Sequence, residues 1–140
     1  SDEEVQIVKS TTSAYIPNLK IILEKKEIIE LQQLIRRVPV ADNVINFAVE
    51  LVRKTRTNYN GAPQFIHDWI SWGAGPRASQ YLILTSKVLA ALKGKVTPDI
   101  SDVKAMALPV LRHRIVISYN AEAENILVND IIKKLVVDIK

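Results

Sequence analysis

The sequence contains no cysteine, which excludes disulfide frameworks, thiolate metal sites and thiol nucleophiles. It also has no apolar run that approaches the ~20 residues needed to span a bilayer, so we expect no membrane partner. The amino end carries Asp2, Glu3 and Glu4 where a secretory signal would carry basic residues. We therefore predict a cytoplasmic protein that folds as one domain over residues 1–140.

The chain has no Gly-x-x-x-x-Gly-Lys-Ser/Thr phosphate loop and no strand that ends in a magnesium-binding acidic pair. His67 and Asp68 are neighbours, but adjacent residues face different ways and no further ligand lies at metal spacing. We expect no metal site, and we expect that this chain alone cannot hydrolyse ATP.

The net charge of +4 and the isoelectric point near 9.4 suggest nucleic-acid binding. However, the basic pairs Lys25-Lys26, Arg36-Arg37 and Lys133-Lys134 are spread along the chain and interleaved with acids. No basic block and no aromatic stacking platform accompanies them. We therefore expect that nucleic acid is not a partner.

Apolar residues recur at three- and four-residue spacing in most of the chain, which predicts helices. The predicted helices are Ser1 to before Pro17, Glu24–Arg37, Asp42 to before Thr57, Pro76–Leu92, Asp102–Ala107 and Asn129–Lys140. Ser1 and Glu4 have the spacing of a capping box, and Ser101 is placed to cap the short helix after it. Gly94 is suited to end the helix before it.

Three other segments are harder to assign. The segment Gln64–Trp72 is either extended or holds one helical turn. Pro109 predicts a break, after which Val110–Arg114 forms a separate turn of helix. Ile115–Ser118 is the best strand candidate, and we expect its partner near Val96. The fold class is therefore all-α: a small helical bundle with at most a short two-stranded β ribbon.

The stretch from Trp72 to Gln80 is the best candidate site. Pro76 suits the first position of a helix, and Gly73 and Gly75 before it allow a ligand or another backbone to approach closely. Free N–H groups at a helix start attract anions. Arg77 lies in the first turn and leans toward the same end, where its guanidinium suits phosphate or carboxylate oxygens. The alternative is an ordinary Gly-Pro helix start that carries a surface arginine.

Two further groups of residues are assigned structural roles. Arg112, His113 and Arg114 point in different directions on a helix, so they cannot share one ligand, and we expect a structural or interface role for them. Trp69 and Trp72 are expected to pack in the core or at its rim.

Several runs of the sequence resemble MoxR-type AAA+ ATPases. They occur in the same order as in that family: Leu34–Val40, Val44–Val49, Trp72–Ala78, Asp102–Ala105 and Val110–Ile115. The resemblance implies a helical lid of the AAA+ type over residues 21–140, which follows a linker helix over residues 1–20 and an absent ATPase core. Ala41 and the segment Asn125–Leu127 depart from the family pattern and leave the subfamily open.

In this family the Gly-Pro-Arg at the lid helix is the sensor-2 motif, and its arginine reaches the γ-phosphate of ATP. The resemblance maps this motif onto Gly75, Pro76 and Arg77, with Arg77 as the catalytic contact. It implies ATP as the cofactor, with Mg²⁺ held mainly by the absent core. The implied partners are the protein's own core, a homo-oligomeric ring of about six subunits, and a client such as a metalloenzyme or a von Willebrand factor A domain protein.

The whole protein would then be an ATPase with a chaperone-like remodelling role, and this part alone would be inactive. The alternative from another class is a stand-alone helical interaction module with no nucleotide role. It explains the missing phosphate loop, but it does not explain why a glycine-flanked helix start carries an arginine.

Overall fold

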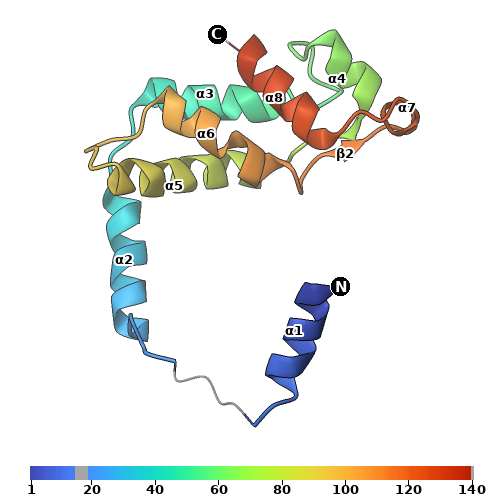
Figure 1. Ribbon diagram of the computed structural model, residues 1–140. Coiled ribbons are helices and arrows are strands. Elements are labelled where there is room, and N and C mark those ends of the chain that lie inside the picture. The colour runs from blue at the N-terminus through green and yellow to red at the C-terminus, as the bar shows by residue number, and fades with distance from the viewer. Residues whose placement is uncertain (15–18, 140) are drawn as a thin grey trace. The chain divides into compact units, whose positions relative to one another are not determined.

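The computed structural model describes residues 1–14 and 19–139 (Figure 1). These residues form eight helices and two short strands, which confirms the predicted helical fold with a small ribbon. They fall into two compact units, residues 1–30 and residues 31–140. No helix in the described part of the chain is long and apolar enough to cross a membrane.

Helix α1 (Asp2–Thr11) belongs to the first unit, and none of its residues is buried. Ser1 stands at its cap position, but its side chain makes no capping hydrogen bond, so the predicted capping box is wrong. Because the helix is exposed, water can satisfy its free N–H groups. The helix ends before Pro17, as predicted, although Pro17 itself lies outside the described residues.

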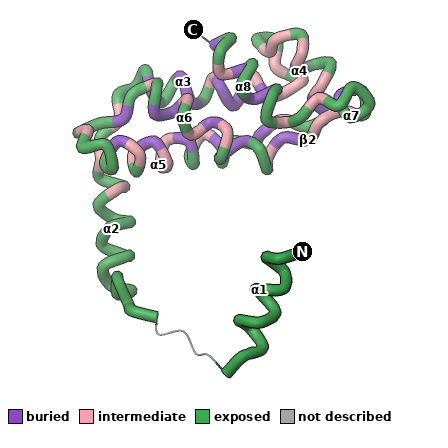
Figure 2. The backbone as a smooth tube through the Cα atoms, viewed as in Figure 1, coloured by how far each residue is buried: buried purple, intermediate pink, exposed green. Residues whose placement is uncertain are grey.

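Helix α2 (Lys25–Arg37) matches its predicted position and contains the boundary between the two units. None of its residues is buried (Figure 2). Ile28 and Leu31, on the predicted apolar face, are 43% and 48% exposed.

The second unit is built on α3 (Asp42–Arg53), α5 (Pro76–Leu92), α6 (Ile100–Leu111) and α8 (Val128–Asp138). Helix α5 packs against α6 and α3, and α6 also packs against α8 (Figure 1). The buried faces of these helices meet in one apolar core (Figure 2). Its fully buried side chains include Leu51, Leu82, Val103, Leu111, Ile132 and Leu135.

Helix α5 begins and ends where the sequence predicts. Pro76 is at its first position, where a missing N–H breaks no helical bond. Gly94 has a φ of +70°, a conformation that glycine adopts without strain. Its N–H donates to the Ala91 carbonyl at 3.0 Å and the Lys95 N–H donates to the Ala90 carbonyl at 2.9 Å. These two bonds form a Schellman motif that ends the helix.

The start of α6 differs from the prediction. Asp99, not Ser101, is the cap, and its side chain accepts hydrogen bonds from the N–H groups of Ser101 and Asp102. The Asp102 side chain accepts in return from the Asp99 N–H, which completes a capping box. Both candidates suit a cap, but Asp99 alone has an acid three residues later.

Pro109 lies inside α6, so the predicted break at this residue is wrong. The helix continues to Leu111, and Val110 and Leu111 are both buried. Pro109 removes only one helical hydrogen bond. Burial of the two apolar side chains after it offsets that loss, an example of tertiary packing that outweighs local propensity.

Helix α4 (Gln64–Trp69) resolves the ambiguous aromatic segment, and β1 (Ile70–Trp72) follows it directly. Strand β2 (Val116–Ile117) pairs antiparallel with β1, with Ile70 opposite Ile117 and Trp72 opposite Val116. The strand prediction near residue 116 is confirmed, but its expected partner near Val96 is wrong. Val96 lies in the loop between α5 and α6 and is 84% exposed.

Helix α7 (Tyr119–Ala123) was not predicted. It ends at Ala123, and Asn125 follows two residues later with a φ of 57°. Asparagine tolerates this left-handed conformation better than most residues. Helix α8 then covers Val128–Asp138, close to the prediction, and Lys140 lies outside the described residues.

Candidate functional site

The end of α3 positions the segment that enters α5. Thr55 is fully buried, and its hydroxyl donates to the Val52 carbonyl at 2.7 Å and accepts from the Ala74 N–H at 2.9 Å. The Nε atom of Arg56 donates to the Ala74 carbonyl at 2.9 Å. Both backbone polar groups of Ala74 are therefore bonded by two consecutive residues just after α3.

Gly73 is required by this packing. A β-carbon at position 73 would collide with the Thr55 carbonyl oxygen and would lie 2.8 Å from the Cα atom of Arg56. The close approach predicted at this glycine is thus made by the chain's own backbone. A role for Gly73 in binding a cofactor stays a prediction.

Gly75 differs from Gly73 because nothing lies within 4 Å of a β-carbon placed on it. Its φ of −82° and ψ of 176° are open to any residue. Gly75 is the N-cap of α5, and its own carbonyl accepts the Ala78 N–H at 3.0 Å. Neither its packing nor its backbone conformation explains a glycine here, so the open space beside it is free for an external group.

Arg77 lies exposed in the first turn of α5, as predicted. Within the described residues its guanidinium forms no hydrogen bond and no ion pair, and its N–H donates to no backbone carbonyl. The tip of α5 thus presents a free cation beside a free N–H group and an open glycine. Such a tip can accept an anion.

A pocket of about 350 Å³ lies next to this tip. It is lined by Arg56, Thr57, Asn58, Ser71, Trp72, Gly73, Ala74 and Gly75. Gly73 and Gly75 line it, whereas Pro76 and Arg77 do not. Reasoning from the sequence missed Arg56, because its partner Ala74 is 18 residues away and no local pattern connects them.

The two tryptophans have different surroundings. Trp69 is half-buried, with its ring 5.6 Å from that of Phe65 and the Lys134 ammonium 4.6 Å from its ring centre. This confirms packing for Trp69. Trp72 is 73% exposed, so the packing predicted for it is wrong. Its strand is at the surface, and its side chain faces away from the core.

Arg114 in the basic run after Pro109 has a structural role, whereas the structural or interface role expected of Arg112 and His113 stays a prediction. The Nε atom of Arg114 donates to the Val110 carbonyl at 3.0 Å, and its guanidinium lies 4.9 Å from the centre of the Tyr81 ring. Arg112 and His113 are exposed.

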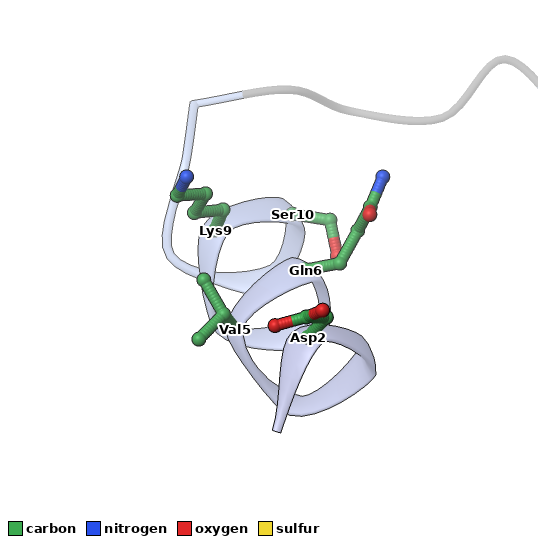
Figure 3. Close-up of a pocket in the computed structure, with 5 residues that line it drawn as sticks. All are labelled: Asp2, Val5, Gln6, Lys9 and Ser10. Carbon is green, nitrogen blue, oxygen red and sulfur yellow. The ribbon is translucent and has the colours of Figure 1, made fainter.

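Two other places offer no binding chemistry. The carboxylate of Asp68 accepts from the Gln64 amide at 3.0 Å, and the described residues contain no group of three or more His, Asp or Glu that could hold a metal ion. A shallow hollow on α1 is lined by Asp2, Val5, Gln6, Lys9 and Ser10 (Figure 3). All five come from a single helix, so the hollow has no opposing wall.

A charge cluster around the buried Asp102 joins α5 to α6. Asp102 is fully buried and accepts from the ammonium groups of Lys93 and Lys95, each at 2.9 Å. Burial alone would raise the pKa of Asp102, but the hydrogen bonds from Lys93 and then Lys95 outweigh it and lower that pKa. Hydrogen bonds from Lys95 and then Ser101 lower the pKa of Asp99. The cluster is structural and lies at the far end of α5 from Arg77.

A helical bundle that presents such a tip has the architecture of an AAA+ lid. A profile of the AAA lid domain family matches residues 64–135, from the start of α4 into α8. The chain is 31% identical over 110 residues to Chaperone MoxR1 of Mycobacterium tuberculosis, which is 79% of this chain and 29% of that protein. It is 26% identical over 142 residues to the uncharacterized protein YeaC of Bacillus subtilis, which is 99% of this chain and 41% of that protein.

A solved structure of a proposed ATPase from Cytophaga hutchinsonii has the same fold, with a TM-score of 0.81 and 24% identity. The match covers 100% of this chain and 43% of that one.

The chain belongs to the AAA lid domain family, and within it to the MoxR type. It spans between 29% and 43% of the length of these relatives.

Proposed function

We propose that this chain is the lid of a MoxR-type AAA+ ATPase, and that Arg77 contacts the terminal phosphate of ATP bound on the ATPase core. The observation that carries the proposal is the free guanidinium of Arg77, exposed beside open space at Gly75 on a helix tip. In this arrangement the core supplies the phosphate loop and holds Mg²⁺. The lid supplies one positive charge where negative charge develops during hydrolysis.

Closure of the lid on the core would bring Arg77 to the nucleotide and couple hydrolysis to motion between subunits. Residues 1–20 would be the linker helix from the core, and residues 21–140 the lid. A homo-oligomeric ring, a client protein that the ring remodels and a cytoplasmic location complete the proposal. One relative carries the name Chaperone MoxR1, which supports a chaperone-like role.

The test is ATP turnover by the full-length protein that contains this chain. Arg77→Ala should slow turnover by about ten- to a thousand-fold, as the loss of other charge-stabilising donors does. The matched control is Arg37→Ala, which removes another exposed arginine, at the end of α2, and should leave turnover within about twofold. Equal turnover by the two variants would remove Arg77 from the mechanism and favour a helical interaction module.

A further inference from the structure

The guanidinium of Arg56 is fixed by a hydrogen bond through one of its three nitrogens, and the other two nitrogens make no hydrogen bond with the described residues. It is half-buried, and its Nε atom donates to the Ala74 carbonyl at 2.9 Å. Its terminal nitrogens donate to no described residue. Because the guanidinium is planar, a bond at Nε fixes the direction of the other two nitrogens. Arg56 therefore presents a pre-oriented fork of donors that loses little conformational entropy when it binds an oxyanion.

The pocket around Arg56 has a positive charge that no acid balances. Its other polar linings are the neutral side chains of Thr57, Asn58 and Ser71, and none of its lining residues is acidic. Trp72 forms one side and is 73% exposed, and its cross-strand partner Val116 is 57% exposed. An exposed tryptophan beside an unpaired arginine is typical of the most energetically important residues at protein interfaces.

We propose that this pocket binds the carboxylate of an aspartate or glutamate on the ATPase core, while Trp72 and Val116 are covered by the apolar surface around that acid. The inference rests on the proposed function, because it takes the core as the partner. More than half of each relative lies outside the matched part, so the relatives carry ample chain to supply this surface. Gly75 both lines the pocket of Arg56 and caps the helix that carries Arg77, so one partner surface can contact both places.

A protein carboxylate fits the pocket better than a phosphate of the nucleotide. The free fork of Arg56 matches the two oxygens of one carboxylate, and the pocket offers no second cation for a doubly charged phosphate group. A volume of about 350 Å³ suits one side chain, and the tryptophan wall suits the apolar surroundings of a residue in a protein surface.

The test uses a thiol reporter, since the chain has no cysteine of its own. Ser71→Cys places a thiol in the exposed wall of the pocket, and Asn129→Cys places one on the exposed surface of α8 as a control. Maleimide labelling at each position is followed by peptide mass spectrometry in two contexts, the full-length protein and the 140-residue chain. We expect labelling at position 71 to be about tenfold slower in the full-length protein, and labelling at position 129 to be equal in both.

Arg56→Gln should then restore labelling at position 71 in the full-length protein. The same substitution in the 140-residue chain should change the rate by less than about twofold, which separates loss of docking from local unfolding. If Arg56 is unchanged and position 71 is labelled at the same rate in the full-length protein and in the 140-residue chain, the docking proposal is overturned. The proposal is also overturned if the full-length protein protects position 129 as strongly as position 71. Protection that survives Arg56→Gln would also overturn it.

The chemistry of the anion is tested with inorganic phosphate. A carboxylate from the core predicts that inorganic phosphate leaves labelling at position 71 of the 140-residue chain unchanged. Protection of position 71 by inorganic phosphate in that chain would identify a phosphate site and overturn the carboxylate. The ATP turnover of Arg77→Ala is measured separately. If position 71 is protected but Arg77→Ala leaves ATP turnover unchanged, only the nucleotide role of Arg77 is refuted. If position 71 is unprotected but Arg77→Ala slows ATP turnover, only the Arg56 site is refuted.

Discussion

The hydroxyl of Thr55 accepts a hydrogen bond from the backbone N–H of Ala74 at 2.9 Å, which ties the residues just after α3 to the segment that enters α5. Thr55 is fully buried, and its own proton goes to the Val52 carbonyl. One side chain thus satisfies a buried N–H that no strand or helix partner reaches. The position of the Gly-Pro-Arg tip depends on this contact, because Ala74 lies only three residues before Arg77.

Thr55→Val keeps the shape of the side chain and removes both hydrogen bonds. We expect the free energy of unfolding to fall by about 1–3 kcal/mol, because the Ala74 N–H would be buried without an acceptor. Urea unfolding of the 140-residue chain measures this change. Thr57→Val is the control, since Thr57 makes no hydrogen bond through its side chain within the described residues, and it should stay within about 0.5 kcal/mol. Equal losses in both variants would contradict the role of Thr55.

Gly73→Ala and Gly75→Ala form a second matched pair. Gly73→Ala places a methyl group against the Thr55 carbonyl and should lower the free energy of unfolding by about 1–3 kcal/mol or more. Gly75→Ala meets open space and should change it by less than about 1 kcal/mol. Denaturant unfolding compares the two variants. A larger loss for Gly75→Ala than for Gly73→Ala would show that the segment packs differently from the structure described above.

Local sequence signals predicted the elements whose ends they specify. Helix α5 is the clearest case, because Pro76 at its first position and Gly94 after its end each have a direct backbone reason. The cap of α6 was misassigned because Asp99 and Ser101 both suit a cap. The local signal for Asp99 is the acid three residues later, Asp102, and the ion pairs from Lys93 and Lys95 hold that acid against the end of α5.

Contacts between distant segments were the part that the sequence did not predict. Val96 lies closer in sequence to the strand near residue 116 than Ile70 does, but Val96 faces solvent and Ile70 is buried in the core. Arg56 was missed for a similar reason, because its orientation in the pocket depends on a hydrogen bond to Ala74, which is 18 residues away in the sequence. Arg77 could be proposed from sequence because its helix tip is a local structure.

Asp102 should make stability depend on pH in acid. Its pKa is lowered in the folded chain below the ordinary value of about 3.9. The stability that it contributes is therefore complete above about pH 4 and is lost as the pH falls toward its folded pKa. We expect the free energy of unfolding to drop below about pH 4, and Asp102→Asn to flatten that drop. Urea unfolding between about pH 2 and pH 7 measures both curves.

At pH 7, Asp102→Asn should cost about 1–3 kcal/mol, because it weakens two part-buried hydrogen bonds from charged groups to a buried acceptor, and half of a capping box. Asp130→Asn is the control. Asp130 pairs with Lys133 at 3.8 Å on an exposed surface and should cost less than about 1 kcal/mol. If the two variants had equal stability and equal pH profiles, the buried cluster would not contribute to the fold as described.

The 140-residue chain should bind ATP only weakly. Its tip offers one free guanidinium and one free N–H group in full contact with water, and Arg77 does not line the pocket that holds Arg56. A single charge-assisted contact that is exposed to water contributes too little to reach micromolar affinity, so we expect a Kd above about 1 mM. Isothermal titration calorimetry of the chain with ATP, and of Arg77→Ala as its control, measures this. Micromolar binding that Arg77→Ala abolishes would mean that the lid holds a nucleotide site of its own, and that the core is not needed to position the phosphate.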